Sequence, residues 1–260
     1  MLNGLDRGEL DEKKRARVKR RQRYSGTAPG VEVVMRARTF FRGGTAIMLE
    51  AIIFDYNGVL INDLNILESA YLKAARALGF ALSSKTIRKF ISYAPDHKRK
   101  LLFGDISDER WNQLMGLKTE FYFEKAENAN LVIPKVDEVL ISLSKRYTLA
   151  LISNATREYF ERTFPAHLSV LFKETLFSDE VTRPKPSPEP LHVMLKRLEI
   201  GKEQCCYVGD SVLDIQMAKS AGISMFAVGT GGNSKDELRK AGADWVLDSL
   251  KDLEAKVEKL

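Results

Sequence analysis

Four places in the sequence put polar or charged side chains directly after an apolar stretch that is typical of a buried β-strand. In a doubly wound sheet, ligands bind beyond the carboxyl ends of the strands, so a site is expected there. The residues are Asp55, Ser153 with Asn154, Lys185, and Asp210 with Asp214. Together they offer a carboxylate nucleophile, a hydroxyl, a cation and oxygen ligands for a metal. This set suits phosphoryl transfer, in which catalysis is mostly in-line positioning and charge neutralisation.

Each of these residues, taken alone, also has a purely structural interpretation. An Asp after a strand, such as Asp55, is often a helix cap, and the pairs at 153–154 and 210–211 are good capping pairs as well. Lys185 alone could be a solvated loop charge. Their joint occurrence in sequence order, each at the predicted end of a strand or in a loop beside one, favours a single shared site.

Helix and strand patterns alternate from Pro134 to the C-terminus, which is typical of parallel β-α units. A further buried strand is expected over Met48–Asp55. We therefore predict an α/β core with a doubly wound, Rossmann-like parallel sheet. The remaining predicted strands are Tyr147–Ser153, Leu171–Phe177, Cys205–Gly209, Met225–Val228 and Trp245–Val246, and the helices are Val136–Lys145, Glu158–Phe164, Pro188–Leu198, Ile215–Ala221, Lys235–Ala241 and Leu250–Leu260.

Residues 64–133 carry helical rather than strand patterns. Apolar residues spaced by three and four predict a helix that starts at Leu64 and is stopped by Gly79. Further helices are expected over Ser84–Ser92, Asp96–Leu102 and Asp108–Asn128. We therefore expect an α-helical cap over 64–133, inserted between two parts of the α/β core at 48–63 and 134–260.

Residues 1–47 differ from the rest in composition. The whole chain has 41 Lys and Arg against 35 Asp and Glu, and this segment holds twelve of the basic residues and five of the acidic ones, so the remainder is nearly neutral. A basic run without apolar periodicity, followed by Gly and Pro, predicts a disordered tail or a mis-annotated start upstream of Met48. Binding of nucleic acid by the tail is not expected, because its basic run lacks interleaved aromatic residues.

The rest of the composition excludes some other classes of protein. No apolar run approaches the length that spans a bilayer, so no membrane segment is expected. Cys205 and Cys206 are adjacent in a predicted strand, whose geometry points them to opposite faces and disfavours a disulfide; this fits a reducing cytoplasm. His97, His167 and His192 are isolated from one another and from the four motifs, so core or surface roles are expected for them.

The four motifs, in their order and spacing, resemble those of the haloacid dehalogenase superfamily. They read Asp55-Tyr56-Asn57-Gly58-Val59, Ser153-Asn154, Lys185 and Gly209-Asp210-Ser211-Val212-Leu213-Asp214. The chain ending, Gly242-Ala243-Asp244-Trp245-Val246 through Asp248-Ser249-Leu250, is similar to the phosphoglycolate phosphatase-like branch, which has a helical cap. The resemblance implies a magnesium-dependent hydrolase, a phosphatase of a small phosphorylated metabolite.

The resemblance also implies a nucleophile and a metal site. Asp55 would attack phosphorus, carry the phosphoryl group as an aspartyl phosphate, and bind Mg²⁺. The backbone carbonyl of Asn57 and the carboxylate of Asp210 would be the other protein ligands, which suits the preference of Mg²⁺ for hard oxygen atoms. Asp214 would act nearby, on the metal or its water.

The remaining motif residues would then hold the phosphate. Ser153 and the amide at Asn154 would hydrogen-bond its oxygens. Lys185 would pair with both Asp55 and the transferring group.

One residue of the first motif departs from the pattern of the superfamily. Its phosphatases usually have Asp two residues after the nucleophile, which protonates the leaving oxygen and later activates water. The amide of Asn57 cannot exchange a proton near neutral pH. The usual Asp at the end of the motif is Asn62, although Asp63 could compensate if the loop places it inward.

Three classes of function therefore stay open. The first is the phosphatase, and the second is a binding or regulatory protein that holds phosphorylated ligands without turnover, which Asn57 favours. The third is a phosphomutase or dehalogenase, which shares the covalent Asp chemistry; a dehalogenase would not need Mg²⁺, and Asp210 and Lys185 favour phosphate. The patterns specify neither the metabolite nor an oligomeric state.

Overall fold

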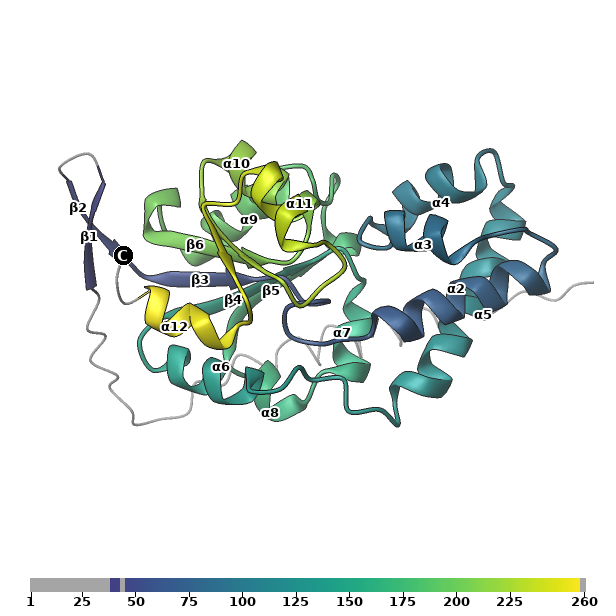
Figure 1. Cartoon of the computed structure of the whole chain (residues 1–260), viewed down its shortest axis with the longest axis horizontal. Coiled ribbons are helices and arrows are strands. Elements are labelled where there is room, and N and C mark those ends of the chain that lie inside the picture. Colours follow the sequence, from purple (N-terminus) through teal and green to yellow (C-terminus); the bar gives the residue numbers. More distant parts are fainter. Residues whose placement is uncertain (1–37, 43–44, 258–260) are drawn as a thin grey trace, which may run out of the picture. The chain divides into compact units, whose positions relative to one another are not determined.

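A computed structural model of the chain describes residues 38–42 and 45–257. Its main sheet has six parallel strands, flanked by helices on both faces (Figure 1). The strands are β3 (Ala51–Phe54), β4 (Thr148–Ser153), β5 (Phe172–Phe177), β6 (Cys205–Gly209), β7 (Ser224–Val228) and β8 (Trp245–Leu247). The helices around them are α6 (Val136–Ser144), α7 (Arg157–Thr163), α8 (Ala166–Ser169), α9 (Glu189–Leu198), α10 (Val212–Ala221), α11 (Lys235–Ala241) and α12 (Lys251–Val257). The predicted fold class, a doubly wound sheet with a helical insertion, is confirmed.

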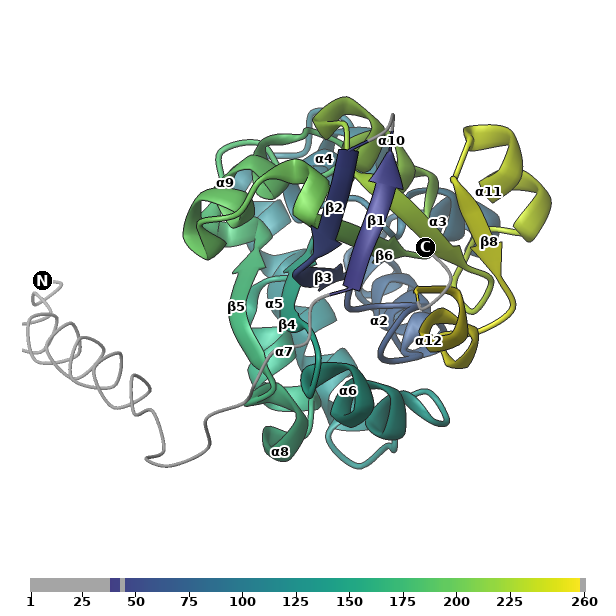
Figure 2. The same ribbon diagram turned by 90° about the vertical axis from the view of Figure 1, so that its left-hand side faces the viewer.

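Residues of each central strand alternate between two hydrophobic layers. In β3, Ile52 and Phe54 join the layer formed with α6, α7, α8 and α12, whereas Ala51 and Ile53 join the layer formed with α9, α10 and α11. Figures 1 and 2 show α9, α10 and α11 on one side of the sheet and α6, α8 and α12 on the other. Burial of both faces explains why these strands are apolar runs rather than alternating ones.

The strands lie in the order β5-β4-β3-β6-β7-β8, so successive strands are added in one direction from β3 and in the opposite direction from β6. From β3 the chain moves outward through β4 and β5, and it then returns to β6 and moves outward the other way. Such a reversal leaves a crevice at the carboxyl ends of the two central strands. Asp55 follows β3 directly and Asp210 follows β6, and the Asp55 amide donates a hydrogen bond to the Val208 carbonyl at 2.8 Å. The fold therefore brings these two carboxylates to one edge.

Four helices form the insertion between β3 and α6 (Figure 1). They are α2 (Leu64–Ala77), α3 (Ser84–Phe90), α4 (Pro95–Phe103) and α5 (Asp108–Ala126). Ser83 and Ser107 cap α3 and α5 by accepting hydrogen bonds from backbone amides of their first turns, and Pro95 occupies the start of α4, where its missing amide costs nothing. The helices enclose a hydrophobic cluster of their own, made of Tyr71, Ala74, Ile87, Ile91, Ile106, Trp111 and Leu114.

The two segments that join this insertion to the core are hydrogen-bonded to each other. The Asn62 amide donates to the Leu131 carbonyl at 2.8 Å, and the Ile133 amide donates to the Leu60 carbonyl at 3.0 Å. The chain therefore enters and leaves the insertion at neighbouring points.

The structure differs from the sequence prediction over Arg38–Leu49. Strands β1 (Arg38–Arg42) and β2 (Thr45–Leu49) form an antiparallel pair where a tail without regular structure is predicted up to residue 47. Aromatic and β-branched residues on either side of a Gly-Gly dipeptide are a sequence pattern of hairpins, and this pattern outweighs the basic charge nearby. The predicted strand over Met48–Asp55 is correspondingly two strands, β2 and β3. The rest of the predicted tail, residues 1–37 and 43–44, lies outside the described residues.

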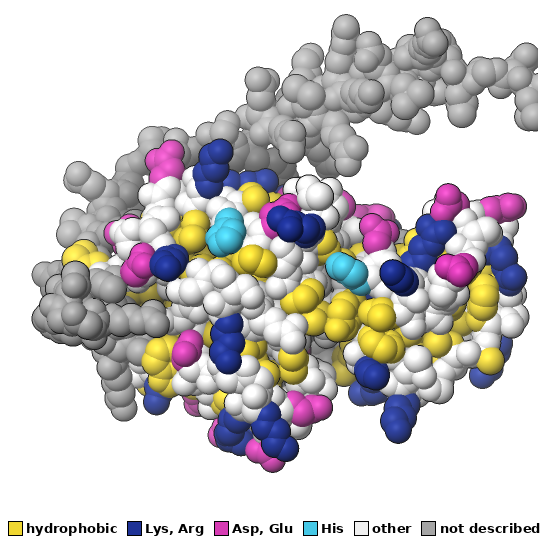
Figure 3. Space-filling view, turned by 90° about the horizontal axis from the view of Figure 1, so that it is seen from above, with side chains coloured by type: hydrophobic (Ala, Val, Ile, Leu, Met, Phe, Trp, Pro, Cys, Tyr) yellow, Lys and Arg dark blue, Asp and Glu magenta, His cyan; other side chains and the backbone are white. Residues whose placement is uncertain are grey.

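On the face shown in Figure 3, basic and acidic side chains are interspersed. Among the helices of the described residues, none has both the length and the apolar character needed to cross a membrane.

A chain that begins at Met48 should keep the fold, because the hydrogen bonds of the six-stranded sheet involve none of residues 1–47. We expect its free energy of unfolding to stay within about 1 kcal/mol of that of the full chain, which corresponds to a change in Tm of roughly 2–4 °C. Thermal unfolding followed by circular dichroism measures this. Insoluble protein, or a far larger drop in Tm, would make the N-terminal segment part of the fold.

Candidate active site

Asp55 presents one bound and one free carboxylate oxygen. Its Oδ1 accepts a hydrogen bond from the Tyr56 amide at 2.7 Å and pairs with Lys185 Nζ at 2.6 Å. Its Oδ2 has no hydrogen bond among the described residues, so it is open to a metal ion or to an electrophile. Burial raises the pKa of Asp55 to about 6, with a further rise from the charge of Asp214 and an opposing effect of Lys185.

Lys185 is held at both its ammonium and its peptide group. Its Nζ lies 2.6 Å from Asp55 Oδ1 and 2.8 Å from Asp214 Oδ1. The side chain of Asn154 accepts from the Lys185 amide at 3.0 Å and donates to the Lys185 carbonyl at 3.2 Å. Burial alone would lower the pKa of Lys185, but Asp214 and Asp55 outweigh it and raise the pKa above its ordinary value. The lysine therefore stays charged between two carboxylates.

Asp214 is fully occupied by neighbours within the core. Its Oδ1 accepts from the Tyr207 hydroxyl at 2.9 Å as well as from Lys185, and its Oδ2 accepts from the Ser211 hydroxyl at 2.5 Å and the Ser211 amide at 3.1 Å. Ser211 in turn accepts from the Asp214 amide, so the two residues cap the first turn of α10. This geometry makes Asp214 a support for Lys185.

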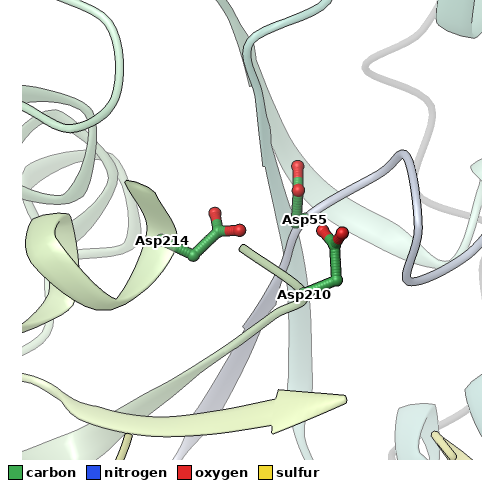
Figure 4. Close-up of side chains that lie close together, drawn as sticks. All are labelled: Asp55, Asp210 and Asp214. Atoms are coloured by element: carbon green, nitrogen blue, oxygen red, sulfur yellow. The ribbon is translucent and has the colours of Figure 1, made fainter. Parts of the chain in front are cut away.

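Carboxylate oxygens of Asp55, Asp210 and Asp214 lie within 4.8 Å of one another (Figure 4). Burial, followed by the charges of Asp55 and Asp214, raises the pKa of Asp210 well above its usual range. When all three carboxylates are ionised, they leave two negative charges beside the one ammonium of Lys185, which a divalent cation would neutralise. The donor set therefore fits a hard metal ion.

Two glycines allow the chain to pass close to the Asp210 carboxylate. A Cβ atom on Gly58, whose φ is +82°, would lie 2.5 Å from Asp210 Oδ2, and one on Gly231 would lie 1.7 Å from the same oxygen. The adjacent Gly232 donates its amide to Asp210 Oδ2 at 3.3 Å. Side chains at these two positions would displace the carboxylate.

The loop places Asp63 inward, beside Asn57. Asn57 Nδ2 donates to Asp63 Oδ2 at 2.9 Å, and the Tyr122 hydroxyl from α5 donates to the same oxygen at 2.7 Å. Asn57 Oδ1 lies 3.5 Å from the hydroxyl of Ser153. Burial raises the pKa of Asp63, and the hydrogen bonds from Tyr122 and Asn57 oppose the rise. The amide of Asn57 is thus already engaged within the protein.

A cavity of about 270 Å³ lies between these motifs and the helical insertion. Asp214 is absent from its lining, which agrees with its enclosed position behind Lys185. The other site residues predicted from the sequence all line the cavity: Asp55, Asn57, Asp63, Ser153, Asn154, Lys185 and Asp210.

The cavity is also lined by residues that the sequence analysis did not single out. Lys98 from α4 and Lys118 from α5 contribute from the insertion, and Gly231 contributes from the loop after β7. The burial of Lys118 could have been predicted from the sequence, because it lies four residues from both Leu114 and Tyr122 on the apolar face of one helix. The loop after β7 would have been found by examining the end of every strand rather than only those followed by a charged residue.

No cysteine or histidine of the described residues lines the cavity. Burial, with a contribution from Glu203, raises the pKa of Cys205 to about 12, and the thiols of both Cys205 and Cys206 are free and buried. A reactive thiolate is therefore not formed at neutral pH. The possible metal ligands that lie together in the described residues are the three aspartates.

Comparisons with known proteins find related sequences and a shared fold. The family model described as haloacid dehalogenase-like hydrolase matches residues 52–228. A phosphoglycolate phosphatase of Vibrio parahaemolyticus is 26% identical over 215 residues, which span 79% of this chain and 94% of that protein. The crystal structure of a hydrolase from Pseudomonas syringae matches with a TM-score of 0.72 and 22% identity, over 82% of this chain and 99% of that one. A β-phosphoglucomutase from Clostridium difficile gives a TM-score of 0.70 and 22% identity, over 82% and 97%. At these identities the two structures show the shared fold alone.

Gly231→Ala should weaken binding of Mg²⁺ by about 10- to 100-fold, because the new methyl group would displace the Asp210 carboxylate from the site. Gly232→Ala is the matched control, since a Cβ atom there meets nothing within 4 Å. Isothermal titration of both variants with Mg²⁺ measures the effect, and thermal unfolding verifies that both are folded. Equal Mg²⁺ affinities in the two variants would show that Asp210 does not bind the metal.

Proposed function

Because this chain belongs to the haloacid dehalogenase-like hydrolase family, we propose that it is a Mg²⁺-dependent phosphatase that transfers the phosphoryl group of a small metabolite to Asp55 and then to water. That it is a phosphohydrolase follows from the family and from its relatives. The observation that carries the finer proposal is the Asp55 carboxylate, which has Oδ1 fixed by Lys185 and Oδ2 unbound at the cavity wall.

We propose that the Asp55 and Asp210 carboxylates and the Asn57 carbonyl hold Mg²⁺. The two unneutralised negative charges of the carboxylate cluster and the close passage of Gly58 and Gly231 around Asp210 support this assignment. When bound, Mg²⁺ supplies positive charge that lets a phosphate approach a carboxylate. Asp214 serves as a positioning residue for Lys185, since its oxygens are already engaged by Lys185, Tyr207 and Ser211.

The proposed reaction has two displacements at phosphorus. In the first, an Asp55 oxygen forms a bond to phosphorus while the ester P–O bond breaks, and the leaving oxygen takes the electron pair and is then protonated by solvent. In the second, a water oxygen attacks phosphorus, the bond to Asp55 breaks, and the attacking water gives its proton to solvent as inorganic phosphate forms. Lys185, the Ser153 hydroxyl and the Asn154 amide neutralise and orient the phosphate oxygens during both steps.

We propose that the helical insertion, residues 64–133, acts as a cap over the catalytic core formed by 48–63 and 134–260. Asn154 Nδ2 donates to the carbonyl of Ser92 in the insertion at 3.0 Å, so the residue that clamps Lys185 also contacts the cap. The volume of the cavity, about 270 Å³, suits small substrates. Phosphoglycolate, the substrate for which the Vibrio relative is named, is the first metabolite to test. The free thiols of Cys205 and Cys206 support the cytoplasm as the compartment of the reaction.

Asp55→Asn should lower kcat for p-nitrophenyl phosphate by at least about 10⁴-fold, because an amide is not a competent nucleophile at phosphorus. The assay is run with saturating Mg²⁺ and repeated after chelation, which should remove the activity of the unaltered chain as well. Acid quenching during turnover followed by peptide mapping should place the phosphoryl group on the peptide that contains Asp55. Substantial turnover by the variant would exclude the covalent mechanism.

Asn57→Asp should accelerate hydrolysis of alkyl phosphates more than that of p-nitrophenyl phosphate. General acid catalysis contributes about 10²–10⁴-fold, and it matters most when the leaving oxygen is strongly basic. In the unaltered chain the Asn57 amide is hydrogen-bonded to Asp63 and has no exchangeable acid proton to give. Steady-state kinetics on both substrate classes measure the difference.

The control for this experiment is the integrity of position 57. Asn57-Gly58 is prone to deamidation because Gly leaves the backbone unhindered, so intact mass and a peptide map must accompany the kinetics. If verified Asn57 protein hydrolyses alkyl phosphates as fast as the variant does, another group, with Asp63 the first candidate, is the acid. If neither protein hydrolyses a phosphate ester with Mg²⁺ present, a protein that binds phosphorylated ligands without turnover becomes the better proposal.

A further inference from the structure

Two lysines of the helical insertion are buried at the cavity wall without an anionic partner. Lys98 on α4 is 6% exposed and Lys118 on α5 is 4% exposed, and both line the cavity that contains Asp55. Neither forms an ion pair with a carboxylate among the described residues. Lys118 Nζ donates to the Tyr159 hydroxyl at 2.6 Å, whereas Lys98 Nζ has no hydrogen bond to any described residue.

The two ammonium groups share one aromatic neighbour. Lys98 Nζ lies 5.3 Å and Lys118 Nζ 5.2 Å from the centroid of the Tyr71 ring, and Lys118 Nζ also lies 4.5 Å from that of Tyr159. A contact with an aromatic ring recovers less free energy than a hydrogen-bonded anionic partner would supply to a buried cation. The aromatic rings therefore offset only part of the cost of burying two like charges together.

The pKa values of Lys98 and Lys118 agree with an incompletely compensated burial of their ammonium groups. Burial lowers the pKa of Lys98 to about 8, and burial together with the charge of Lys98 lowers the pKa of Lys118 to about 7. The acidic groups that oppose the shift are Asp63 for both lysines and Glu158 for Lys118. An anion bound between the two ammonium groups would restore both pKa values toward the ordinary range of lysine.

We propose that Lys98 and Lys118 bind a second anionic group of the substrate, so that the enzyme selects phosphate esters that also carry a carboxylate or a second phosphate. The proposal rests on the phosphatase function stated above, since it takes the phosphoryl group to lie at Asp55 in the same cavity. Because these lysines and Asp55 line the same cavity, the lysines can bind one end of a ligand while the core binds its phosphate at the other end. Lys98 and Lys118 are therefore specificity-determining residues.

Three phosphonates of similar size test the proposal without depending on a leaving group. Propylphosphonate has a neutral end, 3-phosphonopropanoate has a carboxylate, and ethane-1,2-diylbisphosphonate has a second phosphonate. Their inhibition constants are measured against hydrolysis of p-nitrophenyl phosphate. We expect the unaltered enzyme to bind one or both of the compounds with a second anionic group at least about tenfold tighter than propylphosphonate, and the stronger of the two identifies the anion.

Lys98→Met and Lys118→Met should each reduce this preference by about tenfold or more, as expected for losing a hydrogen bond to a charged group. Lys98→Arg keeps the charge and should keep the preference. Lys100→Met on α4 and Lys125→Met on α5 are matched controls, because both lysines are exposed on the same helices and should leave the preference unchanged. Replacing an unpaired buried ammonium by an apolar side chain should not lower Tm, so thermal unfolding separates a binding effect from a folding defect.

The possible failures can be distinguished. If the unaltered enzyme hydrolyses p-nitrophenyl phosphate but binds all three phosphonates equally, the anion subsite is wrong and the phosphatase proposal stands. The same conclusion follows if both Met variants keep the preference. If the unaltered chain hydrolyses no phosphate ester, the phosphatase proposal fails, and calorimetric titration with the same three compounds then decides whether the two lysines select an anion.

Discussion

The ammonium of Lys185 lies between the carboxylates of Asp55 and Asp214, and the rest of the site is arranged to keep it there. A buried cation needs its counter-charges at fixed distances, because the low dielectric of the interior makes an unpaired charge costly. Asn154 therefore clamps the peptide group of Lys185, while Tyr207 and the first turn of α10 orient Asp214. The same lysine restrains the rise in the pKa of Asp55, so one interaction links the architecture of the sheet to the ionisation of the proposed nucleophile.

The positive charge around the cavity comes from two sources with different degrees of pairing. The core supplies Lys185, which is neutralised by its neighbours, and the helical insertion supplies Lys98 and Lys118, which are not. A protein interior seldom keeps unpaired ammonium groups without a use for them, since replacing such groups by apolar ones often increases stability. The lysine proposed to take part in catalysis is therefore ion-paired, whereas the two lysines proposed for recognition have no ion pair among the described residues.

The sequence alone predicts much of the fold, because parallel strands with both faces buried read as short apolar runs separated by helical periodicity. It also predicts the core of the site, because the strand ends that carry Asp55 and Asp210 must meet where the strand order reverses. It does not reveal the partners that long-range packing brings together, such as Asn57 with Asp63 and Tyr122, or Asn154 with Lys185. The burial of Lys98 cannot be predicted from the sequence, because it depends on how α4 packs against the rest of the insertion. The charged residues around Lys98 in α4 do not distinguish it from an exposed lysine.

The paired segments at 60–62 and 131–133 have a consequence for how such a protein changes over evolutionary time. Because the insertion departs from and returns to the core at neighbouring points, its length and internal arrangement impose no strain on the sheet. The helices between these points enclose a hydrophobic cluster of their own, so mutations away from the residues of α2 and α5 that pack on the core are absorbed locally. A lineage can therefore duplicate the gene and remodel the insertion to accept new ligands, while the machinery for breaking the phosphate ester is inherited intact.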